Sequence, residues 1–280
     1  MAGKTWEELT IQDNFIFGKS METSPEICKW LLEKILHIEI KGLTYPEREK
    51  SIDVRRDSKG IRLDVFVQEA DGESSYDLEM QVIGQDDLPK RIRYYQGLID
   101  MDAMDKGHYY WMLGKTAIIF ICTFDYFGEG RHIYTFHQRC DEDNAIQLQD
   151  GTTKVFLNAY GTMDDVDDDL KAFLDYVAGK QVSHPVVDEL DAVVQKVKHN
   201  KDWRSEYMRY EHELAAREHL AREDGRKEGR EEGREEGRDF TIVASLKSLI
   251  KNTKATVDEA MNMLDIPTAD RSKYLALLKN

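Results

Sequence analysis

The spacing of apolar residues predicts an α/β region followed by an all-helical one. Apolar side chains recur at three- and four-residue steps over residues 6–21 and 25–38, which is typical of amphipathic helices. Strand-like runs interrupted by one helix continue to about residue 160, and the helical pattern returns from 164 onward. The expected strands are 50–55, 61–69, 75–83, 115–124, 131–139, 146–148 and 153–158, and the further helices are 87–107, 164–177, 185–199, 202–222, 240–251, 256–264 and 269–278.

This order of elements divides the chain into four parts. We expect a mixed α/β domain over 1–160, a helical extension over 161–224, a glycine-arginine-glutamate repeat over 225–238 and a small helical tail over 239–280. Each glycine of the repeat costs roughly 1 kcal/mol relative to alanine inside a helix. The glycines either allow close approach of a second helix or mark a solvated linker, and we favour the linker. The tail suits either a DNA-binding unit or a support for homo-oligomers.

Asp71-Gly72 is the strongest hairpin signal in the chain and favours a type I′ turn. If these two residues form the loop, alternation leaves one face of the hairpin wholly apolar, which fixes the register. The opposite face then carries mostly polar residues in directly opposed positions. The pairs on that face are Phe66 with Asp77, Asp64 with Glu79, and Arg62 with Gln81.

The pairing of Asp64 with Glu79 raises a chemical question. Opposed residues lie about 4.5–5.5 Å apart at their Cβ atoms, where two ionised carboxylates repel unless they share a proton or hold a cation. Carboxylates with a backbone carbonyl suit Mg²⁺ or Mn²⁺, and such an ion activates water and clamps a phosphate oxygen. The alternative is a solvated face on which Arg62 or a nearby lysine balances the acids. The residues alone leave both interpretations open.

Charge and hydropathy limit the partners that we expect. The net charge is −15, so nucleic acid binding requires a local basic patch. Basic residues crowd over 48–62 and 90–93, and 241–280 is the net basic part of the chain. No apolar run reaches about 18 residues, and the N-terminus has no stretch of signal-peptide type. We therefore expect a cytoplasmic protein that does not enter a membrane.

Several motifs together resemble the PD-(D/E)XK phosphodiesterase core, and most closely the Rpn or YhgA-like branch of recombination-promoting, transposase-like nucleases. The resemblance covers nearly the whole chain and implies a mixed sheet flanked by helices, followed by an all-helical C-terminal region. The motifs are DNFIFGKSM from Asp13, RLDVFV with Asp64, DLEMQ with Glu79 and Gln81, KRIRYYQG with Arg91, Arg93 and Tyr94, the glycine repeat, and VDEAMNMLDIP near the end.

By this resemblance, Asp64 and Glu79 would be ligands of Mg²⁺ or Mn²⁺, with the carbonyl of Met80 as a third ligand. Gln81 would position water or a phosphate oxygen. Asp13 is a weaker candidate for an added catalytic acid, and its alternative role is a helix N-cap or a surface aspartate. The implied function is a metal-dependent DNA endonuclease linked to recombination, transposon-like mobility or defence.

The helix after the hairpin would contribute DNA contacts. Arg91, Arg93 and Tyr94 would hold a phosphate or else brace the active-site strand and its core. The sequence departs from the motif at two positions. Leu63 replaces the proline before the first acid, and Gln81 replaces the usual lysine. Glutamine carries no charge and is no useful general base. The alternative is therefore a catalytically weak or inactive nuclease fold that binds DNA or protein and oligomerises through its helical tail.

Overall fold

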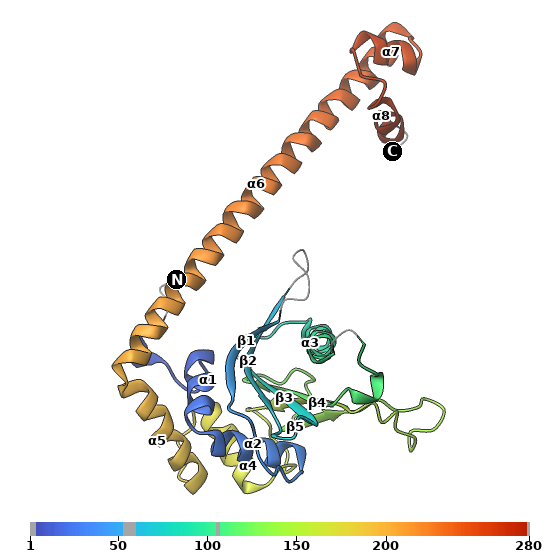
Figure 1. The fold of residues 1–280 in the computed structure, drawn as a ribbon. Helices are drawn as coiled ribbons and strands as arrows, with labels where there is room; N and C mark the ends of the chain where they lie inside the picture. Colours follow the sequence, from blue (N-terminus) through green and yellow to red (C-terminus); the bar gives the residue numbers. More distant parts are fainter. Residues whose placement is uncertain (1–3, 53–59, 105–106, 279–280) are drawn as a thin grey trace. The chain divides into compact units, whose positions relative to one another are not determined.

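Six strands form one mixed sheet in the order β1-β2-β3-β4-β6-β5 in the computed structural model, which describes residues 4–52, 60–104 and 107–278 (Figure 1). Strands β3, β4 and β6 are parallel, and β1, β2 and β5 are antiparallel to their neighbours. The predicted α/β class with a mixed sheet is confirmed. The strands are β1 (Glu47–Ile52), β2 (Ile61–Gln68), β3 (Ser74–Gln81), β4 (Lys115–Cys122), β5 (Ile133–Phe136) and β6 (Thr152–Asn158).

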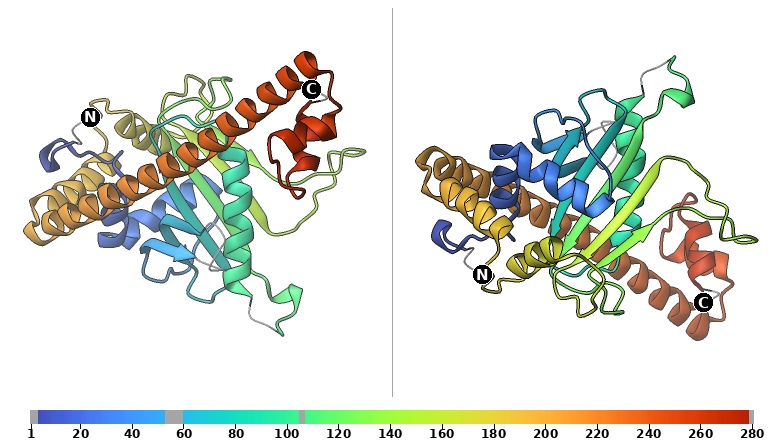
Figure 2. Two further views of the ribbon diagram at one scale, coloured as in Figure 1. Left: turned by 90° about the horizontal axis from the view of Figure 1, so that it is seen from above. Right: turned by 90° about the horizontal axis from the view of Figure 1, so that it is seen from below.

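Helices cover both faces of this sheet (Figure 2). Helix α3 connects β3 to the parallel strand β4 and lies on one face, while α1, α2 and α4 lie on the opposite side. A parallel pair requires such a crossover, because the end of one strand lies far from the start of the next. Helix α5 packs against α1 and α4. The helices are α1 (Asn14–Thr23), α2 (Pro25–Leu36), α3 (Leu88–Ala103), α4 (Asp168–Val177) and α5 (Pro185–His199).

Strand β4 shows why both faces must be covered. Its sequence is KTAIIFIC, and every residue after Lys115 is buried. Ile118 and Phe120 pack in one apolar cluster with Ile92 and Ile99 of α3. A strand buried on both sides has a continuous rather than an alternating apolar pattern, and its burial contributes about 25 cal/mol per Å² of apolar surface.

Two of the elements expected in the first 160 residues are not found as predicted. The helix expected over 6–21 is divided into a 3-10 turn at Trp6–Glu8 and α1, because Asp13 adopts an extended N-cap conformation. Residues 146–148 form no strand, and a single bridge joins Arg139 to Gln147. The last part of the first expected strand, 53–55, lies outside the described residues.

The β2–β3 hairpin has a longer loop than the predicted type I′ turn. A type I′ turn requires a positive φ at both central residues, but Gly72 has a φ of +78° and Asp71 has no positive φ. The N–H of Gly72 instead donates to the carbonyl of Glu69 at 2.9 Å, and the N–H of Glu69 donates to the carbonyl of Ser74 at 2.9 Å. The loop is therefore 70–73, and the predicted register is confirmed for the pairs from Val65–Leu78 to Gln68–Ser75.

One long helix, α6 (Lys201–Thr253), replaces the two helices and the linker expected over 202–251. Its start is anchored by Tyr207, whose ring centroid lies 5.4 Å from that of Trp6 and 5.3 Å from that of Phe15. The glycine repeat lies inside this helix. Apart from the adjacent residues and backbone turns of the helix itself, no atom of the described chain lies within 4 Å of the position that a Cβ would occupy at any of its glycines, which are Gly225, Gly229, Gly233 and Gly237.

Contacts divide the chain into a unit of residues 1–207 and a unit of residues 208–280. In the second unit the end of α6 packs with α7 (Val257–Met263) and α8 (Arg271–Leu278) around a small apolar core. The predicted helical C-terminal region is confirmed, while the finer boundaries at 160, 224 and 238 stay a prediction. Over the ranges that the structure describes, none of the helices combines the length and the apolar character needed to cross a membrane.

Gly114 provides a test of the close backbone contact between the start of β4 and the loop of the hairpin. A Cβ at this position would lie 2.7 Å from the carbonyl oxygen of Glu73, which also accepts a hydrogen bond from the N–H of Lys115 at 2.9 Å. We expect Gly114→Ala to lower the free energy of unfolding by about 1–3 kcal/mol, because backbone atoms must shift. Gly97→Ala, in open space on α3, should instead raise it by about 1 kcal/mol. Urea unfolding of the full chain measures both, and equal effects would contradict the close contact.

Candidate active site at the opening of the hairpin

A cleft of about 960 Å³ lies between α3 and the ends of β2 and β3. Acids and amides from the two strands line it, together with basic and aromatic residues of α3 and residues of the segment 82–87. Asn14, at the start of α1, also reaches it. The residues that the sequence predicts for the site and that line this cleft are Asp64, Glu79, Met80, Gln81, Arg91, Arg93 and Tyr94.

The β2–β3 ladder opens where the acids lie. Regular pairing in the predicted register ends at Val65 and Leu78. Beyond that pair, the N–H of Asp64 donates to Oε1 of Glu79 at 2.9 Å, and the N–H of Met80 donates to Oδ2 of Asp64 at 3.1 Å. Each carboxylate therefore accepts a backbone N–H that a regular ladder would direct to a carbonyl.

Glu49 on β1 explains why the N–H of Asp64 is not paired with β1 and can bond Glu79 instead. The β1–β2 register passes over Glu49 and Asp64, although the residues on either side of them are paired. Glu49 has a φ of +57°, a left-handed conformation that is uncommon for a residue other than glycine. Such strain typically costs on the order of 1–3 kcal/mol and is retained only where its surroundings impose it. Here it interrupts the ladder directly beside the first acid of the site.

Three carboxylates are buried on the sheet face that α3 covers. Asp64, Asp77 and Glu79 are 7%, 0% and 2% exposed. Burial raises the pKa of Asp64 to about 6. Burial, followed by repulsion from Asp64, also raises the pKa of Asp77 and that of Glu79 well above their ordinary values. Burial of all three acids contradicts the solvated-face alternative.

Asp77 is the acid to which sequence reasoning assigned no role. Both oxygens of its carboxylate are buried without a hydrogen-bond partner in the described chain. Alternation along the strand already places it on the same face as Glu79, but the pattern does not reveal that Asp77 itself is fully buried. Burial without a hydrogen-bond partner strongly disfavours the ionised form of an acid.

Arg91 connects the polar residues at the centre of the cleft. Its Nη1 donates to Oε1 of Gln81 at 3.0 Å and to Oε1 of Gln85 at 3.0 Å. Its Nη2 donates to the hydroxyl of Tyr95 at 3.1 Å and lies 3.9 Å from Oε2 of Glu79. The structure thus brings Arg91 and Gln81 into direct contact. Sequence reasoning treated Tyr95 as a possible core residue and did not consider Gln85.

The remaining basic and aromatic candidates lie on the same helix. Arg93 and Tyr94 are exposed and line the cleft, and exposed Lys90 does so too. Their positions allow contact with a ligand in the cleft, whereas Arg91 is engaged with residues of the site itself.

Asp13 is not brought together with the other predicted site residues. Its carboxylate accepts hydrogen bonds from Nζ of Lys4 at 2.8 Å and from the N–H of Thr10 at 2.7 Å, at the N-cap of α1. The next residue, Asn14, reaches the site instead, and its Nδ2 donates to Oδ1 of Asp64 at 3.1 Å. The only sequence signal for Asn14 is its place in the DNFIFGKSM motif.

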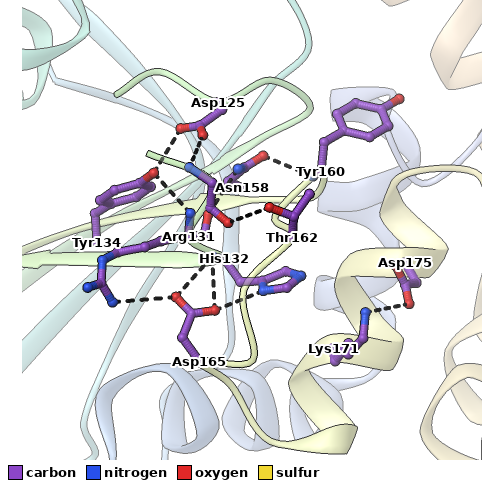
Figure 3. A network of polar contacts seen from close by, with 11 residues as sticks. Asp125, Arg131, His132, Tyr134, Asn158, Tyr160, Thr162, Asp165, Lys171 and Asp175 are labelled. Carbon is purple, nitrogen blue, oxygen red and sulfur yellow. Dashed lines mark hydrogen bonds and ion pairs between the residues drawn. The ribbon is translucent and has the colours of Figure 1, made fainter. Parts of the chain in front are cut away.

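A polar network holds the loop after β4 and strand β5 together (Figure 3). Asp125 accepts hydrogen bonds from the N–H of Gly130 at 2.7 Å and from the hydroxyl of Tyr134 at 3.0 Å. In the same loop, the hydroxyl of Tyr126 donates to the carbonyl of Asp86 at 3.0 Å. This bond ties the loop to the segment 82–87, which leads into α3 and contributes Gln85 and Asp87 to the cleft.

The oxygen atoms at the opening fit a hard divalent cation. In the described part of the chain, no three His, Cys, Asp or Glu side chains are arranged to hold a metal ion, so a third ligand has to come from another group. The N–H of Met80 points at Asp64, and in a strand the C=O of a residue leaves by the same edge as its N–H. Two carboxylates, from Asp64 and Glu79, with this carbonyl form a set suited to Mg²⁺ or Mn²⁺.

The mixed sheet and the acids at the open hairpin place the chain in the PD-(D/E)XK class of proteins. The family model described as "PD-(D/E)XK nuclease family transposase" matches residues 14–162, which is more than half of the chain. The protein belongs to this family, and the predicted relationship is confirmed. Comparisons with curated proteins and with solved structures found no match.

The buried acids predict an unusual dependence of stability on pH. A carboxyl whose folded pKa is raised contributes stability below its unfolded pKa, and this stability is lost as pH rises through the folded value. For Asp64 the interval from 3.8 to about 6 corresponds to about 3 kcal/mol. We expect the free energy of unfolding, measured by urea in EDTA, to fall between about pH 4 and pH 7.

The Asp77→Asn variant tests the same point, because it removes one of the three acids without changing the size of the side chain. We expect its free energy of unfolding to fall less steeply over this interval than that of the unmodified protein. Parallel curves for the two proteins would show that Asp77 is ionised in the folded state.

Proposed function

We propose that this protein is a metal-dependent endonuclease that hydrolyses phosphodiester bonds in DNA. The observation that carries the proposal is the pair of buried carboxylates, Asp64 and Glu79, which cross at the opened end of the ladder and face a cleft lined by basic residues. Membership of a nuclease family supports this chemistry. A buried acid cluster of this kind is costly to maintain for structure alone.

Asp64, Glu79 and the carbonyl of Met80 would hold Mg²⁺ or Mn²⁺. When bound, such a cation lowers the pKa of a water molecule and offsets negative charge on a phosphate oxygen. The chain's own contribution is to fix the two carboxylates, each held by a backbone N–H of the other strand. Asn14 adds a third constraint through its hydrogen bond to Asp64.

Gln81 would orient the attacking water or a phosphate oxygen through its carboxamide. It is 8% exposed and lines the cleft beside Glu79, so it is positioned to touch a bound phosphate. A glutamine donates and accepts hydrogen bonds but does not abstract a proton at neutral pH. Proton removal therefore depends on the bound cation rather than on residue 81.

DNA binding would depend on the local basic surface of the cleft. The net charge of −15 repels nucleic acid, so Lys90 and Arg93 would provide the main electrostatic contacts, with Tyr94 beside them. We place Arg91 at the phosphate as well, at the inner end of this surface. Cytoplasmic action in recombination, transposon-like mobility or defence is part of the proposal, and homo-oligomerisation through the C-terminal helices stays a prediction.

Replacing either carboxylate tests the proposal. Asp64→Asn and Glu79→Gln should each lower Mg²⁺- or Mn²⁺-dependent nicking of supercoiled plasmid by more than about 100-fold, because even the outer-shell partners of metal ligands contribute about 10–100-fold. Glu73→Gln, an exposed acid at the far end of the same hairpin, is the matched control and should retain activity. Asp13→Asn tests the weaker candidate. Cleavage that survives both Asp64→Asn and Glu79→Gln would refute the proposal. Salt-dependent DNA binding without cleavage would favour a binding module.

Asn14→Ala tests whether the placement of Asp64 matters. We expect about a 10–100-fold loss of Mn²⁺ affinity, measured by calorimetry, because the variant removes a hydrogen bond that orients a ligand. Gln12→Ala is the matched control, since Nε2 of Gln12 donates to the carbonyl of Val177 at 2.7 Å, away from the cleft. Equal Mn²⁺ affinity in the two variants would show that Asn14 does not support the site.

A further inference from the structure

We propose that Arg91 supplies, from helix α3, the positive charge that residue 81 lacks, and that it fixes the orientation of the Gln81 carboxamide. This inference rests on the proposed nuclease function and deepens it, because it assigns Arg91 and Gln81 to one functional unit. It changes the expected role of Arg91 from a surface contact with DNA to a group that acts at the reacting phosphate.

The contact between the two side chains defines which way Gln81 points. Arginine has only donors, so the atom of Gln81 that lies 3.0 Å from Nη1 has to be the amide oxygen. The amide nitrogen then faces the other way, toward Oε2 of Glu79 at 3.5 Å. Arg91 therefore turns an otherwise ambiguous carboxamide into a fixed donor beside the acid of the site.

The guanidinium also brings its charge to the acids. Nη2 of Arg91 lies 3.9 Å from Oε2 of Glu79, in a partly desolvated setting where an opposite charge is felt more strongly than in water. Residue 81 on β3 cannot provide this charge, because it is glutamine. A planar guanidinium can face a phosphate and still bond the glutamine, because its donors point in several directions.

Arg91 is held firmly enough to act in this way. The hydroxyl of Tyr95 accepts from Nη2 at 3.1 Å, and Gln85 accepts from Nη1 at 3.0 Å. The guanidinium carbon lies 5.6 Å from the centroid of the Phe120 ring, which belongs to the buried strand β4. The side chain remains 24% exposed, so the charge borders the cleft rather than the core. Arg93, two residues further along the helix, is exposed and has a different surrounding.

The proposal can be tested by moving the positive charge from residue 91 on α3 back to residue 81 on β3. We expect Arg91→Gln to lower kcat for plasmid cleavage by about 10²–10³-fold with little change in KM, since a positioned donor to developing charge contributes about that much. In the double variant Arg91→Gln/Gln81→Lys, a lysine on β3 should recover at least about tenfold. Gln81→Lys alone should give no gain, because two cations then face each other.

Further measurements separate this role from a structural one. Arg91→Lys retains charge and should exceed Arg91→Gln in kcat, while Arg93→Gln should mainly raise KM. Thermal unfolding and DNA binding in EDTA show whether each variant is folded and binds. Wild-type kcat in Arg91→Gln, or no recovery in a folded double variant, would overturn the inference. Wild-type protein that does not cleave, or that cleaves independently of Asp64, would instead overturn the proposed function.

Discussion

Burial of acidic groups is the constraint on which the rest of this structure depends. Asp64, Asp77 and Glu79 share one face of a hairpin, and all three are buried beneath or beside α3, with Asp64 and Glu79 at the cleft. Neither solvation nor salt screening relieves their repulsion there, so protons or a cation must do so. The backbone N–H groups that bond Asp64 and Glu79, and the guanidinium of Arg91, reduce the cost without removing it.

The fold positions these groups through one connection. Because β3 and β4 are parallel, the chain must cross the sheet between them, and the crossover helix α3 lies over the polar face of the hairpin. The same helix brings Arg91 to Gln81 and exposes Arg93 toward the cleft. The loop after β4 then ties back to the start of this crossover through Tyr126. Topology, rather than local sequence alone, assembles the site.

The Asp71-Gly72 signal and the apolar alternation together predicted the hairpin register, which is confirmed from Val65–Leu78 to Gln68–Ser75, and Asp64, Glu79 and Gln81 line one cleft as that register implies. They could not reveal that the acids are buried, because a covering helix is a tertiary feature, and Asp77 was therefore left without a role. The contact of Asn14 with Asp64 spans 50 residues and follows no local period. The continuity of α6 was missed because glycine propensity favours a break, whereas the helix passes through the repeat.

The left-handed backbone of Glu49 has a consequence for how the carboxylate of Glu79 is held. An edge strand tends to pair along its whole length with its neighbour. Complete pairing here would direct the N–H of Asp64 to β1 and remove the hydrogen bond that it donates to Glu79. The left-handed conformation of Glu49 in the outermost strand therefore keeps this N–H available to the carboxylate of Glu79. The placement of an acid on the third strand thus depends on an edge-strand residue whose own side chain is paired with Arg48.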